Sequence, residues 1–252
     1  MNKAKKINIL IWLIILSTLI INYILIRFSG LCSKILRDNL EETVYGNFLL
    51  EVGIFLFVFA GMILCGFYLY HICGKKDYTI QNIFVLCFLF SGTLLASLIA
   101  YRYSPYAMPL VILPLIISFI SNKHIAVCVT VVMTLFIIPI AYGYPEIIFM
   151  HIFTGILASL MASKVEQRKD FPILGLVLTA CNVFVMFIFQ TLKGFNVEEF
   201  LQNTAIVSII TFGCVIATIG ALPFFETISG IISIGIMTKQ KIYQIIKPEE
   251  RL

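Results

Sequence analysis

The sequence predicts an all-α integral membrane protein, a polytopic bundle of about eight helical spans, some of them kinked by proline. Three observations support this prediction: 60% of the 252 residues are apolar and only 12% are charged, the mean hydropathy is +1.02, and the apolar residues fall in long runs. Soluble domains have about 45–50% apolar and about 25% charged residues. The chain has too few charged side chains to form the surface of a soluble fold. We therefore expect its main partner to be the lipid bilayer.

The length of the apolar runs favours helices over strands. Backbone groups in lipid must find their hydrogen bonds within the protein, which leaves helices or closed barrels. Barrel strands alternate in polarity over about ten residues, whereas these runs approach or exceed the roughly 20 residues that a helix needs to cross a bilayer. The eight predicted spans are 7–29, 49–72, 82–101, 105–121, 125–142, 146–163, 171–192 and 203–237.

The first run is interpreted as an uncleaved anchor. Lysines precede it, as in a secretory signal, but its apolar part of about 23 residues exceeds the usual 7–15 and no small-residue cleavage site follows. The expected organisation is an anchor span at 1–29, a short external loop at 30–48, a transmembrane bundle at 49–237 and a cytoplasmic tail at 238–252.

The fourth to sixth runs are short and close together, and the bundle has seven spans if one of them does not cross. Proline removes a backbone donor and kinks or breaks a helix. Bent or broken helices are therefore expected in this region. The prolines concerned are Pro105, Pro109, Pro114, Pro139 and Pro145.

Basic residues predict the orientation, because Lys and Arg accumulate on the cytoplasmic side. With the N-terminus inside, thirteen of the eighteen fall in inner segments. The other five are Arg27, Lys34, Arg37, Arg102 and Lys193. This bias favours eight spans with both termini in the cytoplasm, in a bacterial cytoplasmic membrane. Because placement explains the net charge of +5, nucleic acid is not expected as a partner.

Metal, cofactor and catalytic motifs are not found. The three histidines lie on different spans or loops, so they form no metal-binding pair, and most of the seven cysteines lie inside apolar runs. No phosphate loop, nucleophile elbow or dinucleotide fingerprint is present. The sequence therefore predicts neither a cofactor nor an enzyme.

Three polar residues within the spans are candidates for ligand binding or helix coupling. His151 falls in the outer half of the sixth span, and ionisable groups within a membrane usually face an interior cavity. Asn182 lies near the middle of the seventh span, with Gln190 two turns further on. Buried amides need hydrogen-bond partners, and between membrane helices they hold helices together. Helix packing is therefore the alternative interpretation for the two amides.

The last run contains the sharpest feature, Glu226, three residues after the helix-breaking Pro223. An unpaired carboxylate deep in lipid costs several kcal/mol, so Glu226 is expected near the inner boundary, paired or hydrated. Pro223 is expected to mark where the last span bends into an interfacial segment that leads to the tail.

This run resembles the end of the membrane region of bacterial seven-transmembrane HD-type phosphohydrolases, the cyclic di-AMP phosphodiesterase-like proteins, which has the form L-P-x-F-E-x-x-x-G. The matching residues are Leu222, Pro223, Phe225, Glu226 and Gly230. Further likenesses are Tyr106 with Pro109 and Pro114, the loop from Ser121 to His124, and the basic loop from Arg168 to Asp170 before the span with Asn182. The resemblance implies a membrane block that senses a ligand or lipid state.

The chain departs from that family in two places. About nineteen residues separate the first two runs where the family carries a large external domain, and no His-Asp dipeptide of an HD domain occurs before Leu252. Phosphodiesterase activity is therefore not expected.

Two functions remain open. The first is a non-catalytic sensor or scaffold, in which His151, Asn182 and Glu226 recognise a small molecule or couple helices and the tail binds a cytoplasmic protein. The alternative is a small-molecule transporter or substrate-binding membrane subunit, with proline-broken spans lining a cavity. Few charged residues lie at mid-membrane, which disfavours charged cargo. An intramembrane enzyme is the weakest reading, because no acid, base and nucleophile converge.

Overall fold

The computed structural model describes residues 14–18, 20–25, 52–53, 55–56, 59–61, 63, 80–141, 144–165 and 170–229, and every regular element within them is helical. The predicted all-α class is thereby confirmed. The labelled elements are α4 (Ile80–Tyr101), the 3₁₀ helix η1 (Pro105–Ala107), α5 (Ile112–Ile120), α6 (Lys123–Ile137), α7 (Pro145–Ala162), α8 (Asp170–Lys193) and α9 (Val197–Ser229).

Among the described residues, four helices are long and apolar enough to cross a membrane. Their apolar stretches are Ile83–Tyr101, Pro145–Ala162, Asp170–Lys193 and Val197–Phe225. They coincide with the third, sixth, seventh and eighth predicted spans. The protein is therefore a multi-pass membrane protein, while the total of eight crossings stays a prediction.

The fourth predicted span is broken, as its prolines indicate. Ser104 caps η1 by accepting a hydrogen bond from the backbone N–H of Tyr106, and Pro105 occupies the first turn. After this turn α5 has only nine residues, about 14 Å of helix, which is too short for a hydrocarbon core about 30 Å thick. Every residue of α5 except Ile112 is buried, so this piece forms part of the core.

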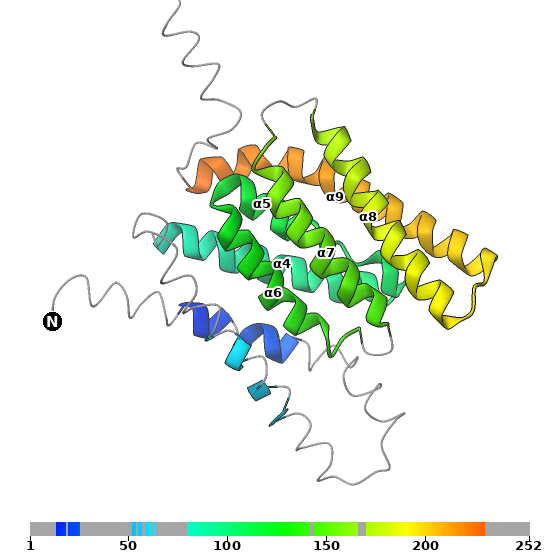
Figure 1. Cartoon of the computed structure of the whole chain (residues 1–252). Coiled ribbons are helices and arrows are strands. Elements are labelled where there is room, and N and C mark those ends of the chain that lie inside the picture. Colours follow the sequence, from blue (N-terminus) through cyan, green and yellow to red (C-terminus); the bar gives the residue numbers. More distant parts are fainter. Residues whose placement is uncertain are drawn as a thin grey trace, which may run out of the picture.

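The core surrounds α5, which packs against α4, α6, α7 and α9. Outside it, α7 packs against α8 and α8 against α9, and Figure 1 shows α8 and α9 side by side along one flank. One large apolar cluster joins these helices, and its fully buried members include Leu94, Leu113, Phe136 and Leu178. An Asn22 side chain from the first predicted span donates to Ser91 Oγ of α4 at 2.9 Å.

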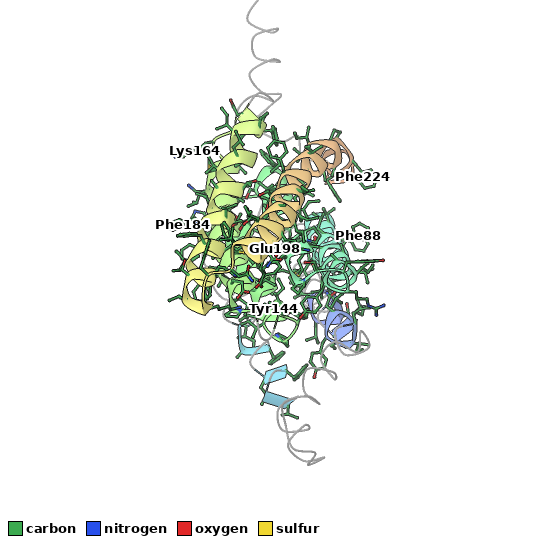
Figure 2. The ribbon with its side chains drawn as sticks, turned by 90° about the vertical axis from the view of Figure 1, so that its right-hand side faces the viewer. Phe88, Tyr144, Lys164, Phe184, Glu198 and Phe224 are labelled. Atoms are coloured by element: carbon green, nitrogen blue, oxygen red, sulfur yellow. The ribbon has the colours of Figure 1, made fainter. Side chains whose placement is uncertain are left out.

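The outer faces of the long helices carry large apolar side chains. Phe88 on α4, Phe184 on α8 and Phe224 on α9 are each about 60% exposed. Figure 2 shows Phe184 on one side of the bundle and Phe88 and Phe224 on the opposite side. Soluble monomeric proteins rarely expose such large apolar surfaces to water. These faces instead match a lipid environment.

The last helix differs from its predicted boundaries. It begins at Val197, six residues before the expected start, because Asn196 Oδ1 accepts hydrogen bonds from the backbone N–H groups of Glu198 and Glu199 at 3.1 and 3.3 Å. The two glutamates also favour a helix N-terminus. At the other end α9 continues through Pro223 to Ser229, so the proline does not end the helix.

Candidate functional site

A polar network joins three helices near their middles. Thr154 Oγ1 of α7 donates to Asn182 Oδ1 of α8, and Asn182 Nδ2 donates to Thr211 Oγ1 of α9 at 2.9 Å. All three side chains are buried. A buried amide that lacked partners would cost free energy, so this network favours one register of α7, α8 and α9.

A small cavity lies beside this network. Its volume is about 30 Å³. Its polar lining comes from Tyr106, His151, Asn182 and Thr211. The remaining walls are apolar or weakly polar: Pro105, Met108, Leu110, Val111, Ile147, Met150, Val207, Ile210 and Cys214. The cavity therefore presents a polar patch in an otherwise hydrophobic pocket, a common form for a binding site.

His151 lies one turn before Thr154 on α7, and only 2% of its surface is exposed. Neither ring nitrogen has a hydrogen-bond partner by geometry among the residues that the structure describes, although the backbone of Thr130 on α6 lies beside the ring. No carboxylate lines the cavity. A charged imidazolium would be costly in such surroundings, so the ring is neutral, with one donor and one acceptor nitrogen.

Helices α6 and α7 pack closely one turn from His151. A Cβ atom on Gly155 would collide with the side-chain methyl of Thr130. The hydroxyl of Thr130 donates to the carbonyl of Ala126, which orients that methyl. The absence of a side chain at Gly155 therefore lets α7 approach α6, one turn from His151.

A second cluster of polar side chains lies at the end of the bundle where α7 begins and α8 ends. Glu146 is buried in the first turn of α7, and the Lys193 ammonium forms a salt bridge with its carboxylate. The Tyr106 hydroxyl donates to Glu146 Oε1 at 2.7 Å. The Lys193 Nζ also lies 5.8 Å from the ring centroid of Tyr144, close enough for a cation–π contact. Because Tyr106 also lines the cavity, this group adjoins the candidate site.

The structure brings two of the five predicted site residues together. His151 and Asn182 line the same cavity. Gln190 is buried two turns further along α8 and does not line it. Pro223 lies on the exposed side of α9, twelve residues beyond Thr211 and thus about 18 Å along the helix. The side chain of Glu226 lies outside the described residues.

Sequence reasoning missed Thr154 and Thr211, and it did not single out Glu146. A threonine within a helix commonly donates to the carbonyl four residues earlier, as Thr93 and Thr218 do here. Nothing in the sequence separates those threonines from the two that bind Asn182. For Glu146, the one available signal was its place in the first turn after Pro145, beside an apolar span.

The arrangement suits binding and helix coupling. The polar groups at the cavity are a neutral imidazole, a carboxamide and a hydroxyl. Across the described ranges, no group of three or more His, Cys, Asp or Glu residues could hold a metal ion. The lining therefore favours a neutral hydrogen-bonding molecule over an ion.

A family model described as "7TM receptor with intracellular HD hydrolase" matches residues 48–233. The match includes all of α4 to α9 and the run from Leu222 to Gly230 that carries the sequence resemblance. That resemblance is thereby confirmed. No curated protein matches the chain, and no solved structure matches it.

Proposed function

The chain belongs to the family of 7TM receptors with an intracellular HD hydrolase, and we propose that it acts as a non-catalytic membrane sensor that couples a membrane or ligand signal to a cytoplasmic protein. The matched residues are the membrane region of such proteins. In this proposal the bundle detects the signal, and the segment after α9 delivers it.

The observation that supports the proposal is the Thr154–Asn182–Thr211 network. Each of its members lies near the middle of a long helix, and Asn182 satisfies both neighbours at once. A hydrogen-bond network between membrane helices has discrete arrangements, because each alternative register must find partners for the same groups. A ligand or lipid state that favours another register would shift α7 and α9 relative to α8.

Helix α9 offers a path for such a shift. It contains 33 residues, about 50 Å of continuous helix. Thr211 lies near its middle and Ser229 at its end. A displacement of α9 at the network would reach Ser229, because a helix transmits rotation and translation along its axis.

The test is a quantitative pull-down from native membranes with a tag at the N-terminus. We expect a cytoplasmic protein recovered in fixed ratio to the chain, and its loss when residues 238–252 are deleted. Asn182→Leu should change the amount recovered at equal membrane abundance, because it disconnects α7 from α9. The matched control is Thr218→Val on α9, which removes a buried hydroxyl that bonds only within its own helix.

The transporter alternative has a different outcome. Vesicles reconstituted with the purified chain would accumulate a labelled solute, and Asn182→Leu would abolish that uptake. Such a result would overturn the sensor proposal. The proposal would also fail if the amount of partner recovered were unchanged by both the tail deletion and Asn182→Leu.

A further inference from the structure

Two helices of the network do not pack closely against each other. Helix α7 packs against α5, α6 and α8, whereas α9 packs against α4, α5 and α8. The direct polar connection between them runs through Asn182 on α8. Beside that connection lies the cavity, with His151 of α7 and Thr211 of α9 both in its lining.

The polar groups at the cavity have hydrogen-bonding capacity to spare. Neither nitrogen of His151 makes a hydrogen bond of good geometry with a described residue, and the backbone of Thr130 beside the ring can satisfy at most one of the two. Thr211 Oγ1 accepts from Asn182, and its own O–H is a donor for which no observed hydrogen bond competes among the described residues. A neutral imidazole and a hydroxyl can each donate and accept. A ligand that can both donate and accept therefore suits these two groups in either arrangement.

The volume of the cavity limits the size of that ligand. The cavity has a volume of about 30 Å³. Measured in the same way, one water molecule needs about 10–15 Å³. One or two molecules of that size therefore fit, whereas a nucleotide, a sugar or a lipid headgroup does not. No Lys, Arg, Asp or Glu side chain lines the cavity, which disfavours an ion.

We propose that the cavity between α7, α8, α9 and the segment from Pro105 to Val111 binds one or two neutral, water-sized molecules that bridge His151 on α7 to Thr211 on α9. This bridge is a second link between the two helices, parallel to the direct link through Asn182. An exchangeable molecule in one link lets the two helices change their separation while their polar groups stay satisfied. Occupancy of the cavity is independent of signalling, because it follows from the lining alone.

Solid-state NMR of the full chain in lipid bilayers tests this site. With histidine labelled by ¹⁵N, magnetisation is transferred from water to the protein, and the signal of His151 is identified by its loss in His151→Gln. We expect rapid transfer to the His151 ring, although it is fully buried. In a sample with threonine methyls labelled by ¹³C, the Thr218 methyl, buried on α9 away from the cavity lining, should receive little transfer at the same mixing time.

Two threonine variants locate the bound molecule. Thr211→Val keeps the shape of the side chain and removes the hydroxyl, so transfer to His151 should fall several-fold. Thr218→Val, an equally buried change on the same helix, should leave it unaltered. If Thr211→Val does not fold, the wild-type protein still decides the question. Absence of rapid transfer to its His151 ring, both from water and from added ¹³C-methanol, would overturn the proposal.

A second sample containing ¹³C-methanol distinguishes water from a small dissolved alcohol as the bridging molecule. Continued transfer from water alone identifies solvent water as the occupant. Transfer from methanol to the His151 ring identifies a site open to dissolved alcohols of that size. A His151 ring that receives transfer from neither molecule refutes the site.

Discussion

Lys193, in the last turn of α8, donates two hydrogen bonds to the carboxylate of Glu146 in the first turn of α7, at 2.9 Å to Oε1 and 3.0 Å to Oε2. The carboxylate is almost fully buried, whereas the lysine side chain is 44% exposed. Tyr106 gives the carboxylate a third hydrogen bond. The pair therefore ties the ends of two helices together beside the candidate site.

Lys193→Met should destabilise the protein by about 1–3 kcal/mol. It leaves a buried carboxylate without its cation, a change that costs about 3–5 kcal/mol for a fully buried pair, and the partial exposure of Lys193 lowers that cost. Glu146→Gln should cost about 1 kcal/mol, because the amide still accepts from Tyr106 and the lysine can turn to water. Reversible unfolding in mixed detergent micelles measures both.

The double variant separates the ion pair from general effects. Lys193→Met combined with Glu146→Gln should be less destabilised than the sum of the two changes, because the buried charge is gone. Lys164→Met, at the opposite end of α7 and exposed, is the control and should change the free energy of unfolding by less than about 0.5 kcal/mol. Strict additivity would show that the pair has no energetic coupling.

Asn182→Leu should reduce stability by about 1 kcal/mol, the scale of a hydrogen bond between membrane helices. The cost is modest because the freed hydroxyls of Thr154 and Thr211 can turn to carbonyls of their own helices. Asn182→Asp should cost more, since a carboxylate at this depth brings several kcal/mol of insertion penalty. The same unfolding assay ranks the two variants. Equal stability of Asn182→Asp and wild type would contradict the buried position of residue 182.

Gly155→Ala should destabilise the α6–α7 contact by about 1–3 kcal/mol, the usual cost of overpacking. The added methyl meets the Cγ2 methyl of Thr130. Thr130→Ser removes that methyl while keeping the hydroxyl, so the double variant should regain most of the loss. As a matched control, Gly213→Ala on α9 meets no atom within 4 Å and should be neutral or slightly stabilising. Failure of Thr130→Ser to rescue would place the strain elsewhere.

The orientation predicted from the basic residues can be tested at the two ends of the α7–α8 pair. In a cysteine-free background, Glu198→Cys should react with a membrane-impermeant maleimide in intact cells. Lys164→Cys should react only after permeabilisation, because positively charged loops stay in the cytoplasm. Both positions are exposed, so access rather than burial decides the result. The reverse labelling pattern would refute the assignment of cytoplasmic termini.

Hydropathy and proline positions predicted much of the fold. The third, sixth and seventh predicted spans, 82–101, 146–163 and 171–192, lie within about two residues of α4, α7 and α8. The start of α9 was missed by six residues, because the cap at Asn196 lies outside the apolar run and its effect depends on local backbone geometry. The total number of membrane crossings and the predicted boundary between the bundle and the tail at residue 238 stay predictions.

The candidate site was predictable only in part. His151 and Asn182 stood out because polar side chains are rare within apolar runs, and the structure places both at one cavity. Their partners Thr154 and Thr211 were not identifiable, because a lone threonine satisfies itself within a helix as readily as it pairs with a neighbour.

The sequence by itself determined that this protein resides in a membrane, that it is helical, and which family it belongs to. Those properties follow from residues near one another in the chain, because transfer to lipid and backbone satisfaction act on each segment separately. Tertiary structure alone decided that α5 is a buried core piece, that Glu146 pairs with Lys193, and that Asn182 joins α7 to α9. These relationships depend on which helix faces which, and the packing of the whole bundle selects those faces.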